Sequence, residues 1–227
     1  LLPDLLDLLQ RSNSSDSRFL CLKLFTAIVQ LYLDAPEPHS DSLQRGSTAS
    51  HINEMVFNIL LPAYQALLVD EHPIPLYAQK LLVTLLETDD GALIRRVSEL
   101  DLHATFFSFL SLEHANNNVH NARVCKILIA SPAVSFNAIA EYEVVEKVLA
   151  VLLYAFDNLV EPFLEVIVDL CSILLDREKD VGVLGKASSS LVEYMDLLLE
   201  LCLHNDQRIA EPASACIVSR PIQNLAN

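Results

Sequence analysis

Four acidic residues at helical spacing could bind a positively charged ligand. They are Glu161, Glu165, Asp169 and Asp176, separated by four, four and seven residues. This spacing places their side chains on one face of a helix, where they form a polar stripe on an otherwise apolar segment. The stripe contains no basic residue. Like charges four residues apart destabilise a helix by about 0.2–0.5 kcal/mol per pair. The stripe is therefore either a solvated face or a groove for a basic segment of a partner protein.

A second acidic stripe follows on the next predicted helix and consists of Glu193, Asp196 and Glu200. Residues 141–211 hold 15 acidic and 5 basic residues, which accounts for 10 of the net charge of −15. Such a surface favours a partner with a basic or coiled-coil segment. It also excludes a nucleic-acid partner, because a phosphate backbone would be repelled.

Asparagines at the start of a later helix are another candidate for partner binding. Asn117 and Asn121 precede or begin the third helix of a predicted repeat. In armadillo proteins an asparagine on that helix can hold a peptide backbone. Capping and turn preference also explain these residues and are the commoner reason for asparagine at a helix start, so both interpretations stay open.

Catalytic and ligand-binding motifs are missing from the sequence. Its four glycines cannot form a phosphate-binding loop, and it has no nucleophile elbow, zinc-protease helix or kinase catalytic motif. Its five cysteines are scattered singly, which favours reduced, buried thiols and a cytoplasmic location. We therefore expect a chain that is not itself an enzyme and that takes no cofactor and no metal.

The elements that must position these residues are helices. Hydrophobic residues make up 52% of the chain, with no tryptophan and only four glycines. The periodicity predicts helices at about residues 3–10, 15–33, 52–69, 75–88, 90–99, 101–112, 117–130, 135–141, 143–157, 160–176, 187–203 and 206–218. Flexible loops are expected at 34–50 and, more briefly, at 177–186. Charges interrupt every apolar stretch long enough to cross a bilayer, so we expect no membrane partner.

One hydrophobic pattern occurs twice, at an offset of 42 residues. Positions 93–110 match positions 136–152, so that Val97 corresponds to Ile139 and Phe106 to Val148. A period near 40 in a helical chain is typical of armadillo and HEAT repeats. The predicted fold is therefore an all-α, right-handed α-solenoid, with residues 1–227 as a single domain. Solenoids of this kind bind other proteins.

A longer motif resembles a known family. Leu60-Leu61-Pro62-Ala63-Tyr64 is followed by Pro73 and Pro75 and then by Tyr77-Ala78-Gln79-Lys80-Leu81-Leu82. This run resembles the C-terminal repeat region of Fused-type serine/threonine kinases and pseudokinases, and most closely that of an Unc-51-like kinase. The opening segment and residues 204–217 are similar to flanking repeats of the same family.

The resemblance implies a regulatory tail behind a kinase or pseudokinase domain. It also implies a role in cilia, flagella or microtubule-based processes, with a kinesin-like or microtubule-associated partner. Two alternatives remain at this stage. One is a general solenoid adaptor or regulatory subunit, such as a phosphatase scaffold or transport adaptor, with no kinase attached. The other is a self-associating structural module.

Overall fold

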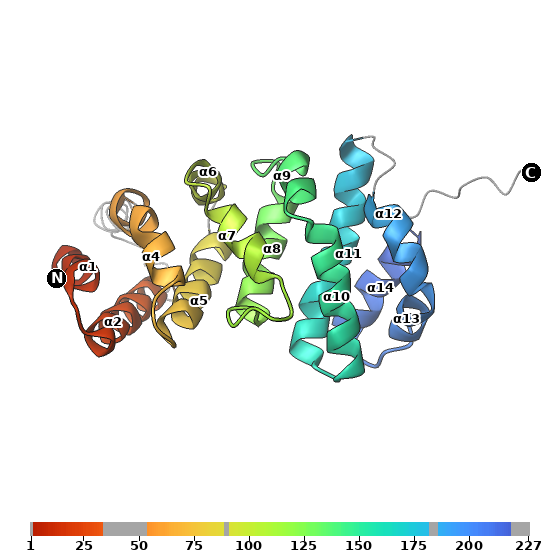
Figure 1. The fold of residues 1–227 in the computed structure, drawn as a ribbon, viewed down its shortest axis with the longest axis horizontal. Coiled ribbons are helices and arrows are strands. Elements are labelled where there is room, and N and C mark those ends of the chain that lie inside the picture. The colour runs from red at the N-terminus through yellow and green to blue at the C-terminus, as the bar shows by residue number, and fades with distance from the viewer. Residues whose placement is uncertain (1, 34–53, 89–90, 182–185, 219–227) are drawn as a thin grey trace, which may run out of the picture. The chain divides into compact units, whose positions relative to one another are not determined.

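The computed structural model describes residues 2–33, 54–88, 91–181 and 186–218, and these ranges contain helices and no strand (Figure 1). In chain order the helices are α1 (Leu2–Arg11), α2 (Ser15–Leu33), η1 (Val56–Leu60), η2 (Leu61–Ala63), α4 (Tyr64–Leu68), α5 (Ile74–Glu87), α6 (Ala92–Glu99), α7 (Leu102–Phe109), α8 (Val119–Ala130), α9 (Phe136–Glu141), α10 (Val144–Asp157), α11 (Glu161–Val181), α12 (Lys186–Ser190), η3 (Leu191–Tyr194), α13 (Met195–Leu201) and α14 (Gln207–Val218). This confirms the all-α prediction.

The chain separates into two compact units, residues 1–102 and residues 103–227. That residues 1–227 form a single domain stays a prediction. The predicted loop at 34–50 lies outside the described residues.

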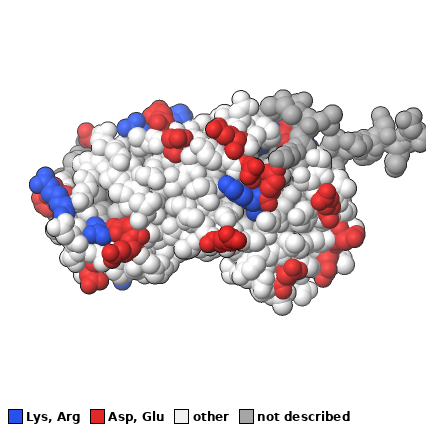
Figure 2. All heavy atoms as spheres, in the orientation of Figure 1, with Lys and Arg blue, Asp and Glu red and all other residues white. Residues whose placement is uncertain are grey.

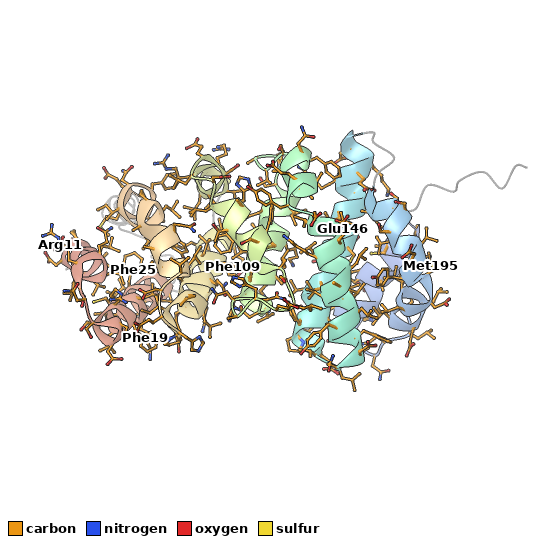
Figure 3. All side chains as sticks on the ribbon, viewed as in Figure 1. Arg11, Phe19, Phe25, Phe109, Glu146 and Met195 are labelled. Atoms are coloured by element: carbon orange, nitrogen blue, oxygen red, sulfur yellow. The ribbon has the colours of Figure 1, made fainter. Side chains whose placement is uncertain are left out.

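In the first unit α2 packs against α1 and α5, and α4 packs against α5. Its interior is built from apolar side chains of all four helices, among them Phe25 of α2 (Figure 3). Tyr64 of α4 is fully buried, and its hydroxyl donates a hydrogen bond to the Ala78 carbonyl of α5. A polar group with a partner can be buried at little cost, so this bond lets an aromatic ring fill the core.

The helix predicted at 52–69 is interrupted in the structure. Residues 56–60 form a π-helical turn and residues 61–63 a 3₁₀ turn before α4 begins. Pro62 explains the change, because it has no N–H and cannot continue the α-helical hydrogen-bond ladder. Leu60 and Leu61, on either side of the change in winding, are both buried.

The 42-residue match is confirmed as a structural repeat. Helices α6 and α7 correspond to α9 and α10, and the matched apolar residues Val97, Ile139, Phe106 and Val148 are all buried. The backbone repeats as well. Asp101, between α6 and α7, has φ 56°, and Glu143, between α9 and α10, has φ 52°. Both φ values lie in the left-handed region, which residues other than glycine rarely adopt. The same sharp turn therefore joins the two helices in each repeat.

The end of α11 was predicted wrongly. The helix continues through Val181, whereas we expected it to end at 176 and a loop to begin at 177. Tertiary contacts explain the extra turn. The buried Glu178 carboxylate accepts hydrogen bonds from the backbone N–H groups of Ala187 and Ser188 at the start of α12, and Arg177 donates to the Val134 carbonyl. The helix predicted at 187–203 is likewise divided into α12, η3 and α13.

Candidate protein-interaction groove

Three helices of the second unit, one from each successive repeat, form a ladder. Helix α11 packs between α8 and α14 (Figure 1). Helix α8 begins at Asn118, whose side-chain oxygen accepts hydrogen bonds from the backbone N–H groups of His120 and Asn121. Helix α14 follows Asp206, whose carboxylate accepts a hydrogen bond from the Arg208 N–H. These caps determine where α8 and α14 begin.

A groove of about 440 Å³ runs across this ladder. We refer to it as the ladder groove, and its lining residues are Lys126, Glu165, Val166, Asp169, Ser172, Arg208, Glu211, Pro212 and Ala215. Helix α8 contributes one cation, α11 the central acidic stripe, and α14 the opposite wall. Two of the four acidic residues predicted on α11 therefore line a hollow that a partner could enter.

Both of these carboxylates bind a cation from a neighbouring helix. Lys126 Nζ lies 3.0 Å from Asp169 Oδ2, and a guanidinium nitrogen of Arg208 lies 3.2 Å from Glu165 Oε2. The stripe on α11 has no base of its own at these positions, and the structure supplies one from each side. The sequence analysis did not identify either basic partner. A signal was present, because each basic residue is 43 residues from its acidic partner, which is close to the length of one repeat.

The Arg208 guanidinium is shared between two carboxylates. It forms a closer ion pair with Asp206, at 2.7 Å, than with Glu165. Hydrogen bonding to Asp206 raises the pKa of Arg208, with a smaller contribution from the charge of Glu165, and the same contact lowers the pKa of Asp206. Both groups therefore stay charged at neutral pH. Arg208 is well exposed, so a competing cation could reach Glu165 from solvent.

The remaining predicted acidic residues lie elsewhere. Glu161 is exposed at the start of α11, and Asp176 is exposed and pairs with Lys179 at 3.3 Å. Glu193 of η3 and Asp196 and Glu200 of α13 are exposed, and none of them lines the ladder groove. On the face drawn in Figure 2, acidic side chains form several separate groups with uncharged surface between them.

The two asparagines proposed to hold a peptide are not in the groove either. Asn121 is fully buried, and its amide donates to the Phe106 carbonyl at 3.3 Å, so a partner cannot reach it. Its role in the structure is to join α8 to α7. Asn117 is half-buried in the turn before α8, where its backbone N–H donates to the His114 carbonyl.

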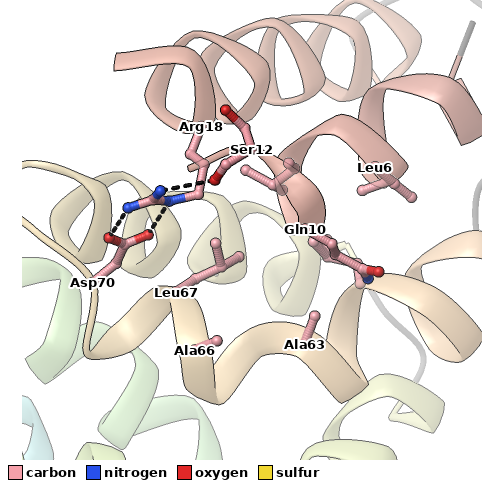
Figure 4. A pocket seen from close by; sticks show the side chains of 10 residues that line it. Leu6, Gln10, Ser12, Arg18, Ala63, Ala66, Leu67 and Asp70 are labelled. Atoms are coloured by element: carbon pink, nitrogen blue, oxygen red, sulfur yellow. Dashed lines mark hydrogen bonds and ion pairs between the residues drawn. The ribbon is translucent and has the colours of Figure 1, made fainter. Parts of the chain in front are cut away.

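The first unit has a smaller hollow, of about 360 Å³, between α1, α2 and the η1–α4 segment (Figure 4). Its walls are mainly leucine and alanine side chains, and one end is closed by Arg18 and Asp70. The guanidinium of Arg18 donates to both carboxylate oxygens of Asp70 and to the Ser12 carbonyl. Because these charges satisfy one another, the hollow offers no free charged group to a ligand.

No group of three or more metal-ligating side chains comes together in the part of the chain that the structure describes. No helix among the described residues is both long enough and apolar enough to span a bilayer.

Comparison with known families places the chain among kinase-associated repeat regions. Residues 1–93 match a family model described as serine/threonine-protein kinase ULK4-like, HEAT repeats, and residues 102–183 match the RUNKEL ARM-repeat domain. Both models describe repeats, and neither is a catalytic domain. The resemblance to an Unc-51-like kinase repeat region is thereby confirmed.

Two relatives show the same relationship. The chain is 32% identical to serine/threonine-protein kinase RUNKEL of Arabidopsis thaliana over 88% of its own length. It is 25% identical to serine/threonine-protein kinase ULK4 of Mus musculus over 93% of its length. These matches cover only 14% and 15% of the two relatives, so the chain spans about one seventh of each.

Proposed function

Because this chain is an armadillo/HEAT repeat region homologous to those of the ULK4 and RUNKEL kinases, we propose that it is a non-catalytic protein-interaction module of a serine/threonine kinase or pseudokinase. Its partner-binding surface is the ladder groove. The observation that carries this proposal is the pairing of Glu165 and Asp169 with cations from two other helices. A groove that already holds an ammonium and a guanidinium group has the geometry to hold those of a partner.

The partner class follows from this chemistry. A segment with lysine and arginine side chains can exchange with Lys126 and Arg208 at the two carboxylates, and the acidic surplus of residues 141–211 attracts it over a longer range. Ion pairs that are partly exposed exchange at small cost, because each contributes only about 0–1 kcal/mol. The chain's own cations therefore do not close the groove.

The cellular setting is the less direct part of the proposal. The resemblance to Fused-type kinases supports a cytoplasmic protein of the cilium, the flagellum or another microtubule-based structure. In that setting a kinesin-like or microtubule-associated protein with a basic or coiled-coil segment would be the partner. The other acidic residues, Glu161, Asp176, Glu193, Asp196 and Glu200, would add long-range attraction without lining the groove.

Binding of a fluorescent 20-residue lysine- and arginine-rich peptide tests the groove by fluorescence anisotropy. Glu165→Lys combined with Asp169→Lys should weaken binding by at least about tenfold, because both cation positions are lost. Glu71→Lys with Glu87→Lys is the matched control. Both residues are exposed in the first unit, and the change in net charge is the same. Circular dichroism should show unchanged helix content in both variants.

Either of two results would refute the groove as the site. One is retained affinity in the Glu165→Lys, Asp169→Lys variant, and the other is an equal loss in the control, which would indicate diffuse attraction by the whole acidic chain. The link to a kinase has a separate test. The natural transcript upstream of Leu1 should encode a kinase domain, and a transcript without one would leave a general solenoid adaptor.

A further inference from the structure

Leucine side chains project from two neighbouring turns at one edge of the second unit. Leu159 lies in the turn between α10 and α11 and is 83% exposed, and Leu203 lies in the turn between α13 and α14 and is 84% exposed. Helices α11 and α14 pack against each other, and the turns that precede them both lie along the lower edge of this unit in Figure 1. Isolated exposed leucine residues are ordinary, but these two occupy corresponding turns of successive repeats and so border the same surface.

The backbone at Leu159 adds a second observation. Its φ of 53° lies in the left-handed region. Leu159 directly follows the C-cap of α10, and the N–H groups of Leu159 and Val160 donate to the Phe156 and Ala155 carbonyls. Glycine is the usual residue at this position, because any other L-residue is strained there. Leucine adds that strain, yet its side chain gains almost no burial within the described chain. Contact with another molecule would offset this strain.

A hollow of about 670 Å³ lies between the two turns. We refer to it as the edge hollow, and its lining residues are Glu161, His204, Asn205, Asp206, Gln207 and Arg208. Asp206 already pairs with Arg208, whereas Glu161 is exposed and forms no ion pair with a cation of the described residues. Glu161 is therefore the carboxylate that is open to an incoming cation. The edge hollow adjoins the ladder groove at Arg208 and otherwise has a different lining.

We propose that this edge binds an amphipathic helix of a partner protein. Two apolar side chains of that helix contact Leu159 and Leu203, and a lysine or arginine between them reaches Glu161. Packed helices lie about 8–10 Å apart, and residues seven apart along a helix are separated by about 10.5 Å. A helix with apolar residues at positions i and i+7 therefore matches the two turns, and its residue i+4 faces the edge hollow.

Charge favours this occupant over the others. Asp157 is exposed two residues before Leu159, so the edge attracts a basic helix and repels an acidic one. A second copy of this chain carries a net charge of −15, which opposes its association with the same edge. The surface is additional to the ladder groove and does not rest on it.

Binding of a designed peptide tests the proposal. The probe is a fluorescent 15-residue helical peptide with leucine at positions 4 and 11, lysine at position 8, and alanine and glutamine elsewhere. By fluorescence anisotropy, Leu159→Gln combined with Leu203→Gln should weaken binding by at least about tenfold, because both apolar contacts are lost. Leu20→Gln with Leu31→Gln is the matched control, because these residues are 63% and 73% exposed on α2 in the first unit. Neither pair of substitutions changes a charge.

A stability measurement separates the role in binding from a role in folding. Leu159→Gly should raise the urea midpoint by roughly 0.3 M, since glycine relieves the backbone strain and no buried contact is lost. The same substitution should weaken binding of the probe by about threefold. A variant that is less stable than the natural sequence would show that the Leu159 side chain packs within this chain, and it would overturn the proposal.

Other results would overturn the proposal as well. They are the absence of measurable binding of the probe, retained affinity in the Leu159→Gln, Leu203→Gln variant, and an equal loss in the control, which would indicate non-specific apolar adhesion. A mass that rises with concentration in sedimentation, and that this variant keeps monomeric, would identify a second copy as the occupant. Because these substitutions leave Glu165 and Asp169 in place, the outcomes are independent of the ladder groove.

Discussion

The ion pair between Arg18 and Asp70 should contribute measurably to the stability of the first unit. Arg18 donates to both carboxylate oxygens of Asp70, at 2.7 and 2.5 Å, and also to the Ser12 carbonyl. One guanidinium thus connects α2 to the α1–α2 turn and to the turn after α4. Hydrogen bonds to a charged group contribute about 1.5–3 kcal/mol when they are shielded from water. The two side chains are 18% and 12% exposed, so most of that value should be retained.

A double-mutant cycle with Arg18→Met and Asp70→Asn isolates the pair. Urea unfolding at pH 7, followed by circular dichroism, should give a coupling free energy of about 1.5–3 kcal/mol. With a denaturant slope near 2 kcal/mol/M, Asp70→Asn alone should lower the urea midpoint by about 1 M. Arg95→Met is the control for loss of a positive charge, because Arg95 is exposed on α6 in the same unit. A coupling below about 0.5 kcal/mol would refute the reasoning, since it would mean that the pair is solvated like a surface ion pair.

The pH dependence of this coupling has a definite sign. The hydrogen bond from Arg18 lowers the pKa of Asp70 below its ordinary value of 3.8. A carboxyl group whose pKa is lower in the folded chain stabilises the fold above its unfolded pKa and loses that contribution as the pH falls through the folded pKa. The coupling should therefore be complete at pH 7 and decline below pH 3.8. A coupling that is the same at pH 7 and pH 2 would contradict the assignment.

Two further predictions concern the core and the thiols. Leu82→Ala removes a fully buried side chain of α5 and should lower the free energy of unfolding by about 2–5 kcal/mol in thermal or urea denaturation. A loss below about 1 kcal/mol would mean that Leu82 does not face the core. Burial raises the pKa of the Cys125 and Cys171 thiols, and that of Cys216 to about 12. Native labelling with a disulfide reagent at pH 8 should therefore modify the half-buried Cys202 first, and mass spectrometry showing Cys125 or Cys171 modified first would disprove the packing of α8 or α11.

The sequence by itself determined the helical class, the repeat and the core. Apolar residues at helical spacing have to be buried whatever their neighbours are, so Val97 and Ile139 could be assigned to matching buried positions without coordinates. The same periodicity identified the stripe on α11 that includes Glu165 and Asp169. These inferences depend only on contacts within one helix, where sequence distance and spatial distance are tied together.

Tertiary structure alone decided what surrounds that stripe. Whether Lys126 reaches Asp169, or Arg208 reaches Glu165, depends on the rotation and stagger of three stacked helices, which no single helix encodes. The sequence analysis assigned Asn121 and Asn117 the same candidate role in peptide binding, yet packing against α7 buries Asn121. The extra turn of α11 likewise comes from a distant partner, since Glu178 holds the start of α12. Local periodicity specifies each helix, whereas the contacts between repeats specify which charges meet.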